Sequence, residues 1–212
     1  MSPLHELPMF PLGSVLFPTM VLPLHVFEPR YRALAEQCLA GDKEFGVCLI
    51  ERGSEVGGGD LRTDIGTVAQ IIDAEQFDDG RWVLACVGTR RIRIDEWLPD
   101  DPFPRAMVEP WLDDQPDTDL SATVDAVIAR LRQVLALQAE LGDPAPPATI
   151  ELDTDPVLAG YQAATLSPFG SFDRQRILAA STPEGRLSLV DELLGDAEVV
   201  LRHRLASGRS AR

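Results

Sequence analysis

The sequence predicts an α+β protein, with strands in the N-terminal half and helices in the C-terminal half. Two observations carry this prediction. The hydrophobic period changes from two residues to about 3.6 near Asp113, and the composition turns acidic over residues 113–119. We therefore expect a β subdomain over residues 1–115, a helical subdomain over 116–205 and a disordered tail over 206–212.

The chain opens with apolar runs that prolines interrupt. Pro8, Pro11, Pro18 and Pro23 divide this region into short strands with bends, because proline cannot donate to a sheet ladder and is found at strand starts, edges and corners. The pair Glu28-Pro29 then begins an amphipathic helix, since proline suits the first helical turn.

Further strands are expected where Val, Ile, Trp and Phe are enriched between turn residues. In residues 91–95 isoleucine alternates with charged residues, which predicts a half-buried strand. Asp78-Asp79-Gly80 is a turn signal, so residues 65–95 should form a long hairpin. Residues 53–60 read as a flexible loop. The expected strands are 44–50, 65–76, 81–97 and 105–111.

The second half carries helical periodicity. Apolar residues recur at three- and four-residue steps from Leu120 to Leu135, which predicts a helix of about 20 residues that ends before Gly142. A proline-rich connection follows over residues 142–156. Three shorter signals then predict helix starts, because Asp or Thr beside Pro is typical of an N-terminus. They are Asp155-Pro156, Asp173 and Thr182-Pro183.

Composition narrows the classes of function. The formal charge is −15, from 34 acidic and 19 basic residues, and such a field repels nucleic acid and anionic membranes. The sequence has no apolar run long enough to cross a bilayer and no signal-peptide pattern, so we expect a cytoplasmic protein. Cys38, Cys48 and Cys86 are too scattered for a zinc ribbon or a disulfide framework, and we expect buried, reduced thiols.

The N-terminal half contains the segment LPLHVFEPRYR at 22–32, and the C-terminal half contains DRQRILAASTPEGRLSLVDELL at 173–194. Together with several shorter segments, they resemble the N-terminal substrate-binding domain of the Lon ATP-dependent protease family. The sequence departs from the family pattern at Thr19, where glycine is usual, which questions a positive-φ turn there, and at His25, where the family has an aliphatic or aromatic residue. The other matching segments are FPL (10–12), LFP (16–18), FGV (45–47), GTVAQI (66–71), DGR (79–81) and GTRRIRI (88–94).

The resemblance implies a PUA-like β pseudo-barrel with one helix, followed by a helical bundle, as a stand-alone domain without the Lon ATPase and protease. The residues agree with a non-catalytic chain. None of the sixteen glycines precedes a lysine, so a P-loop is absent. Lys43, the one lysine, lies in a polar turn, where it cannot serve a Ser–Lys dyad. We expect no cofactor and no metal.

One constellation suggests a binding site at the first helix. Helical spacing directs Tyr31 towards the barrel and Arg30 and Arg32 outward. In the functional interpretation, these residues form a polar rim around an apolar groove that binds exposed hydrophobic peptide. In the structural alternative, Glu28 caps the helix and Arg30 pairs with a barrel carboxylate. The candidate rim consists of Phe10, Phe17, His25, Phe27, Glu28, Arg30 and Arg32.

By resemblance, the chain is a polypeptide-binding module that recognises unfolded or degron-bearing polypeptide. It would act as an adaptor or regulator in protein quality control, with a separate AAA+ protease as a partner. Two alternatives stay open. One is a PUA-like reader of RNA or a small molecule that uses Arg90, Arg91 and Arg93, although nucleic acid fits the acidic charge poorly. The other is a hydrolase built on His25, with His5 and His203 as the remaining histidines.

Overall fold

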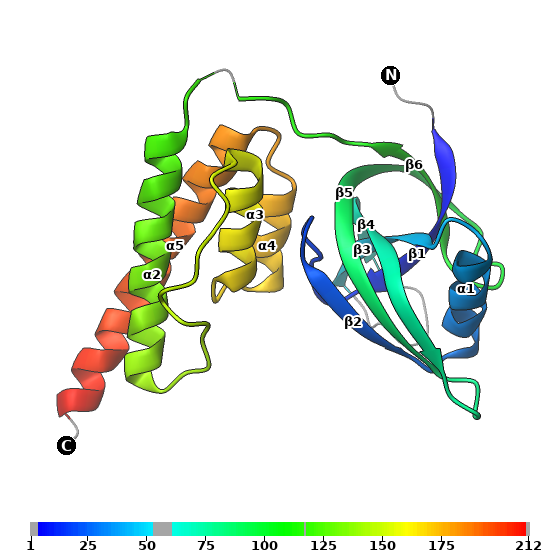
Figure 1. The fold of residues 1–212 in the computed structure, drawn as a ribbon, viewed down its shortest axis with the longest axis horizontal. Helices are drawn as coiled ribbons and strands as arrows, with labels where there is room; N and C mark the ends of the chain where they lie inside the picture. The colour runs from blue at the N-terminus through cyan, green and yellow to red at the C-terminus, as the bar shows by residue number, and fades with distance from the viewer. Residues whose placement is uncertain (1–3, 53–60, 117, 211–212) are drawn as a thin grey trace. The chain divides into compact units, whose positions relative to one another are not determined.

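The structure, a computed structural model, describes residues 4–52, 61–116 and 118–210 (Figure 1). It divides into two compact units, Met1–Leu112 and Asp113–Arg212. Strands form the first unit together with one helix, and helices form the second, which confirms the predicted α+β class. The predicted loop at residues 53–60 lies outside the described residues.

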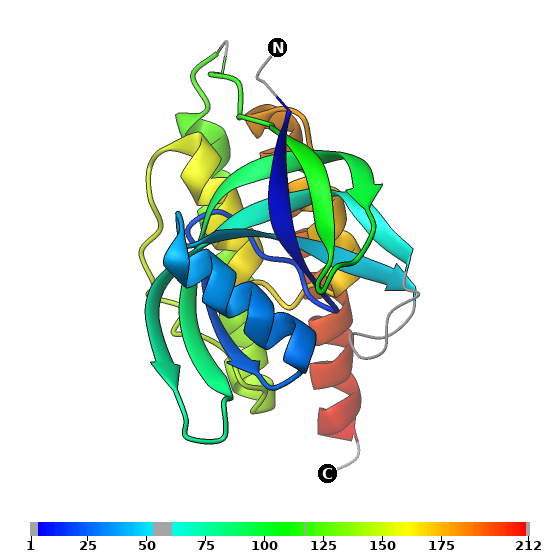
Figure 2. The same cartoon turned by 90° about the vertical axis from the view of Figure 1, so that its right-hand side faces the viewer.

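The first unit is a closed sheet. Its strand order is β2-β5-β4-β3-β1-β6, and β5 also pairs with β6, so five of the strands form a barrel and β2 adds to β5 beside it (Figures 1 and 2). β1 and β3 are parallel, whereas the other pairings are antiparallel. The strands are β1 (His5–Leu12), β2 (Val21–Val26), β3 (Glu44–Arg52), β4 (Leu61–Gln76), β5 (Trp82–Leu98) and β6 (Arg105–Pro110).

The length of β5 allows it to pair with three strands. Its N-terminal part, residues 82–87, pairs with β2, while residues 92–98 pair with β6. β4 runs along the other edge of β5 as the second arm of the predicted hairpin, and Gly80 has φ 81° in the turn that joins them. This confirms the hairpin that Asp78-Asp79-Gly80 indicated.

The turn before β2 keeps a positive φ without a glycine. Thr19 has φ 69°, and its amide donates to the carbonyl of Gly88 at 2.8 Å. The Gly88 amide donates in turn to Met20 O at 2.9 Å, and a Cβ at position 88 would collide with the carbonyl oxygen of Phe17. The close approach of these two segments therefore needs glycine at position 88, while threonine at position 19 is held by its hydrogen bond.

Helix α1 (Pro29–Ala40) lies against the barrel and supplies part of its core (Figure 2). The Tyr31 ring stacks on Phe10 of β1, with the ring centroids 4.0 Å apart. The predicted inward face is confirmed, because the buried residues of the helix are Tyr31, Leu34, Ala35 and Cys38.

The second unit consists of four helices, α2 (Ser121–Leu141), α3 (Pro156–Leu166), α4 (Ser171–Leu178) and α5 (Pro183–Ser210), within its described residues. Gly142 ends α2 in the left-handed conformation with φ 79°. The Asp155 carboxylate caps α3 by accepting from Val157 N at 2.8 Å and Leu158 N at 3.2 Å, as predicted. Thr182 Oγ1 accepts from Gly185 N at 3.1 Å at the start of α5.

Two expectations for this unit were wrong. Asp173 does not cap α4, because Gly170 occupies the N-cap position and Asp173 lies in the first turn, paired with Arg176. Residues 206–210, expected in a disordered tail, are helical, since α5 continues to Ser210. Leu, Arg and Ala dominate residues 201–206 and favour continuation of a helix.

A buried ion pair fixes the start of the second unit to its bundle. The guanidinium of Arg186 on α5 is fully buried, pairs with the carboxylate of Asp113 and lies 4.0 Å from the ring centroid of Tyr161. The Tyr161 hydroxyl donates to the same carboxylate at 2.7 Å. The Asp113 carboxylate therefore links α3 and α5, because it accepts from Tyr161 on one helix and pairs with Arg186 on the other.

We predict that Asp113→Ala destabilises the chain by about 3–5 kcal/mol, because it leaves the buried charge of Arg186 without its partner. Urea unfolding measures this change. Asp114→Ala, at the exposed neighbouring carboxylate, is the matched control and should change the free energy of unfolding by less than about 0.5 kcal/mol. Equal effects of the two substitutions would contradict the assigned role of Asp113.

We also predict that Leu34→Ala costs about 2–5 kcal/mol, because it removes a buried side chain from the contact between α1 and the barrel. The control is Gln37→Ala on the exposed face of the same helix. A loss below about 0.5 kcal/mol in urea melts would show that the helix is not docked as described.

Candidate functional site

The β2 strand presents one apolar face to solvent although its other face is buried. Leu22, Leu24 and Val26 point into the core, whereas Val21, Pro23 and His25 alternate with them on the exposed side. The next residue on that side, Phe27, is 57% exposed. A phenylalanine so exposed at the end of a strand is unusual enough to suggest a contact surface.

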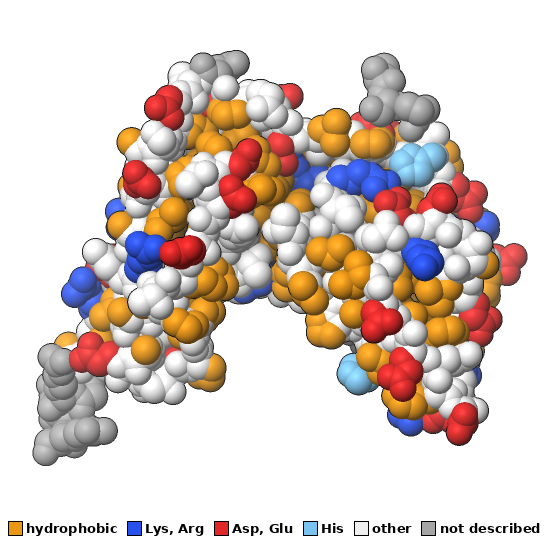
Figure 3. Space-filling model, in the orientation of Figure 1, with side chains coloured by type: hydrophobic (Ala, Val, Ile, Leu, Met, Phe, Trp, Pro, Cys, Tyr) orange, Lys and Arg blue, Asp and Glu red, His pale blue; other side chains and the backbone are white. Residues whose placement is uncertain are grey.

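The exposed face of β2 continues onto its neighbour. Val21, Pro23 and His25 are paired with Val87, Ala85 and Val83 of β5, which are half-buried. A register shift between Ile71 and Asp73 of β4 leaves Ile72 exposed beside this row. Figure 3 shows hydrophobic side chains gathered over β2 and β5.

A narrow slot of about 210 Å³ lies between β2 and the end of β1. Phe10 and Leu12 of β1, together with Tyr31 of α1, line it opposite Leu24 and Val26. The stacked rings of Phe10 and Tyr31 give the slot an aromatic wall. Because β1 and β2 do not pair, this side of β2 leaves room for an apolar group to insert.

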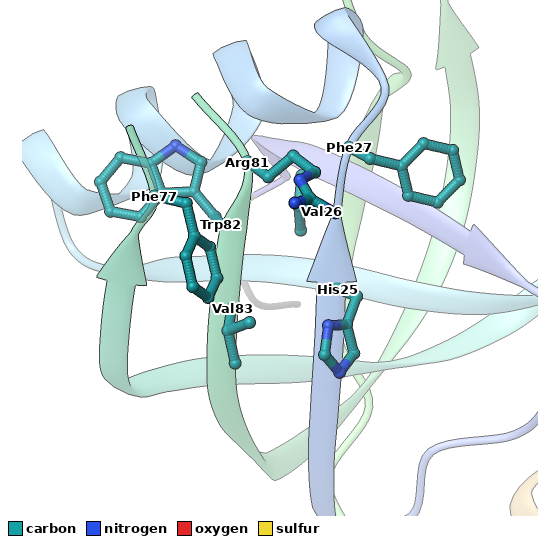
Figure 4. Close-up of a pocket in the computed structure, with 7 residues that line it drawn as sticks. All are labelled: His25, Val26, Phe27, Phe77, Arg81, Trp82 and Val83. Carbon is teal, nitrogen blue, oxygen red and sulfur yellow. The ribbon is translucent and has the colours of Figure 1, made fainter. Parts of the chain in front are cut away.

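A second cavity of about 350 Å³ lies on the other side of the same residues, between β2 and the β4–β5 hairpin. Figure 4 shows His25 on β2 and Phe27 just beyond the end of that strand, with Val83 of β5 and Phe77 of the hairpin turn on the side of His25. The hairpin also supplies Trp82 and Arg81, whose guanidinium is held by Asp79 at 2.7 Å. The slot and this cavity share His25, Val26 and Phe27, so one short segment borders both.

Charged side chains at the start of α1 hold this segment in place. Arg30 Nε donates to Glu28 Oε2 at 3.2 Å, and its guanidinium lies 4.5 Å from the Tyr31 ring centroid. Glu28 stands at the N-cap position but makes no side-chain capping hydrogen bond, so the predicted cap was wrong. Arg32 Nη1 donates to the carbonyl of Asp79 at 3.1 Å and thereby ties α1 to the hairpin turn.

The structure brings four of the seven expected rim residues together, whereas Phe17, Arg30 and Arg32 line neither cavity. His25, Phe27 and Glu28 border the slot, and Phe10 lies at its wall. Phe17 is fully buried in the core, so it cannot contact a ligand. Sequence reasoning missed Phe77, Arg81, Trp82 and Val83. The strand register pairs Trp82 and Val83 with β2, and the other two lie in the hairpin turn.

The arginines of the alternative RNA site do not form an open basic strip. Arg90 makes two 2.7 Å hydrogen bonds to the Glu44 carboxylate, and these bonds lower the pKa of Glu44. Arg91 is buried, with its guanidinium 4.1 Å from the Trp111 ring centroid. Arg93 lies 4.9 Å from the same ring and 3.6 Å from the Glu109 carboxylate.

The cysteines are buried and free, as expected. Burial raises the pKa of Cys38 and of Cys86 to about 12, which keeps both thiols protonated and poorly nucleophilic at neutral pH. Within the described residues, no group of three or more His, Cys, Asp or Glu side chains is placed to hold a metal ion. Over the same residues, every helix is too short or too polar to cross a membrane.

Comparison with known proteins agrees with this architecture. Residues 6–196 match the model of the ATP-dependent protease La (LON) substrate-binding domain, and the chain belongs to that family. Lon protease 2 of Herpetosiphon aurantiacus is 30% identical over 203 residues, which cover 92% of this chain and 24% of that protein. The chain thus spans about a quarter of the length of this relative.

Other relatives place the domain in different contexts. A protein of Schizosaccharomyces pombe named for a LON peptidase N-terminal domain and a RING finger is 25% identical over 87% of this chain and 44% of its own length. The crystal structure of a Lon N-terminal domain protein from Xanthomonas campestris has 30% identity and a TM-score of 0.63, covering 90% of this chain and 98% of the other. The N-terminal domain of Mycobacterium avium complex Lon protease shares the fold, with a TM-score of 0.59 at 17% identity, over 91% of this chain and 99% of the other.

Proposed function

We propose that this chain binds unfolded or degron-bearing polypeptide through the exposed face of β2 and the cavities on either side of its end. The observation that carries the proposal is the position of Phe27, which is exposed between an aromatic slot and a second apolar cavity. We call this region the β2 surface; its exposed members are Val21, Pro23, His25, Phe27 and Phe77, and it includes the half-buried Val83. Membership of the LON substrate-binding domain family supports the same function.

Binding at the β2 surface would depend on side chains more than on strand addition. The Gly88 amide donates to Met20 O, so in an antiparallel pair the backbone groups of Leu22, Leu24 and Val26 face β5. Those of Val21, Pro23 and His25 point to the free edge, and Pro23 has no N–H to donate there. A peptide strand added at this edge would therefore lose a central hydrogen bond.

The energetics of such a site favour weak, promiscuous binding. Burial of one large apolar side chain contributes about 1.5–3 kcal/mol, so two insertions contribute about 3–6 kcal/mol. A micromolar dissociation constant corresponds to a net binding free energy of about 8 kcal/mol. This net value must remain after the entropic cost of ordering the peptide has been subtracted. We therefore expect micromolar affinity or weaker, with little sequence preference.

We further propose that the chain serves protein quality control as an adaptor or regulator. The sequence carries no P-loop, so unfolding and cleavage of a bound client would fall to a separate AAA+ protease. Cytoplasmic location fits this role, since misfolded clients and such proteases meet there. The net charge of −15 would keep a protein with an exposed apolar surface in solution.

The test is a salt series with a reduced, unfolded protein and with RNA as separate ligands. We predict binding of the unfolded protein that persists at high salt, because screening leaves apolar burial intact. Phe27→Ser should weaken it about tenfold, whereas Leu61→Ser is a matched control that should not weaken it, since Leu61 is 56% exposed and lies outside the β2 surface. Tight, salt-sensitive RNA binding without affinity for the unfolded protein would instead support the nucleic-acid alternative.

A further inference from the structure

A groove in the helical unit has no part in the proposed function. It has a volume of about 370 Å³ and lies between α5 and the segment that leads into α4. Phe169 and Pro168 form one wall, and α5 supplies the other wall and the floor. The lining residues of α5 follow helical spacing at Leu193, Ala197, Val200, Leu201 and Arg204.

The wall of this α4–α5 groove is preformed. Arg174 donates to three backbone carbonyls of the segment before α4, those of Thr165, Ser167 and Phe169, at 3.1–3.2 Å. The Arg174 side chain is half-buried, and this burial lowers the pKa of its guanidinium. A groove with fixed walls loses little conformational entropy when it is occupied.

The groove contains apolar surface that the bundle does not cover. Leu193 and Leu201 are buried, but Val200 between them is 59% exposed. Val199, its neighbour, is 69% exposed but does not line the groove. Val199 and Val200 therefore have the same exposed side chain, but only Val200 lines the groove.

The charges that line the groove are mainly negative. Asp196 and Asp173 are its carboxylates; Asp173 is paired with Arg176 at 3.1 Å, whereas no ion pair engages Asp196 among the described residues. The cation in the lining, Arg204, is already bound to Asp143 at 2.6 and 3.1 Å. A ligand with a positive charge next to its apolar side chains would complement this arrangement.

We propose that the α4–α5 groove docks a basic amphipathic helix of another protein. An apolar groove with helical spacing on one wall fits the i, i+3 and i+4 side chains of a helix, and Asp196 would receive a Lys or Arg from its polar edge. A second copy of this chain is a poor occupant, because a net charge of −15 on each copy opposes their approach.

The test uses a fluorescent Leu/Lys peptide of about four helical turns and measures its anisotropy with the full chain. Val200→Ser should weaken binding about fivefold or more, because it removes apolar contact inside the groove. Val199→Ser, the matched control, should leave the affinity unchanged. Asp196→Asn should weaken binding about two- to fivefold and reduce its salt dependence.

Two further peptides separate groove binding from general attraction to an acidic protein. A peptide with Glu in place of Lys, and one of the same composition without amphipathic order, should both bind at least fivefold more weakly. Phe27→Ser should bind the basic peptide as the unmodified chain does, which distinguishes this groove from the β2 surface. Thermal melting of each variant checks that it is folded.

Three results would overturn the proposal. The first is equal affinity of Val200→Ser and Val199→Ser for the peptide. The second is equal binding of the ordered and disordered peptides. The third is a dimer of the unmodified chain in sedimentation that Val200→Ser dissociates, because the groove would then belong to a second copy.

Discussion

The barrel depends on the pairing of β5 with three strands. Its first residues pair with β2, residues 82–93 pair with β4 along the other edge, and residues 92–98 close the sheet on β6. Closure removes the free edges of five strands and leaves β2 as an added strand with an exposed face. The surface to which we assign peptide binding thus exists because β5 pairs with β2 in addition to β4 and β6.

The same arrangement explains why the proposed site is open but not prone to edge-to-edge aggregation. β2 offers apolar side chains and two cavities, yet Pro23 interrupts the donors on its free edge. Phe10 and Tyr31 stack inside the slot, and Arg30 and Arg32 fix the adjoining helix through Glu28 and Asp79. The site can accept apolar side chains while its backbone resists extension of the sheet.

Much of the fold could be predicted from local patterns. The change of hydrophobic period located the boundary between strands and helices, and the cap at Asp155 and the turn at Gly80 follow from local backbone chemistry. Asp173 was misassigned because a carboxylate in the first turn and one at the N-cap look alike in sequence. The boundary residue Asp113 appeared as part of an acidic linker, and its pairing with Arg186 depends on a helix 73 positions away.

The candidate site was predicted less completely, because its members meet through long-range pairing. His25 and Phe27 were identified from their position before the first helix, but the strand register alone places Val83 opposite His25. The prediction of Phe17 as a rim residue, and of Arg90, Arg91 and Arg93 as a basic strip, was wrong for a related reason. The solvent exposure of a side chain cannot be read from a short segment of sequence. The burial of Phe17 and Arg91, and the contact of Glu44 with Arg90, depend on strands that are distant in the chain.

The most direct test of polypeptide binding at the β2 surface is amide chemical-shift mapping. The full chain, labelled with ¹⁵N, would be titrated with an unfolded, apolar peptide that lacks Lys and Arg, so that the acidic surface does not attract it. The account predicts shifts concentrated in residues 21–28 and 77–83, with an aromatic ring-current effect near Tyr31. Shifts confined to Arg90, Arg93 and the residues around them, or to the helical unit, would contradict it.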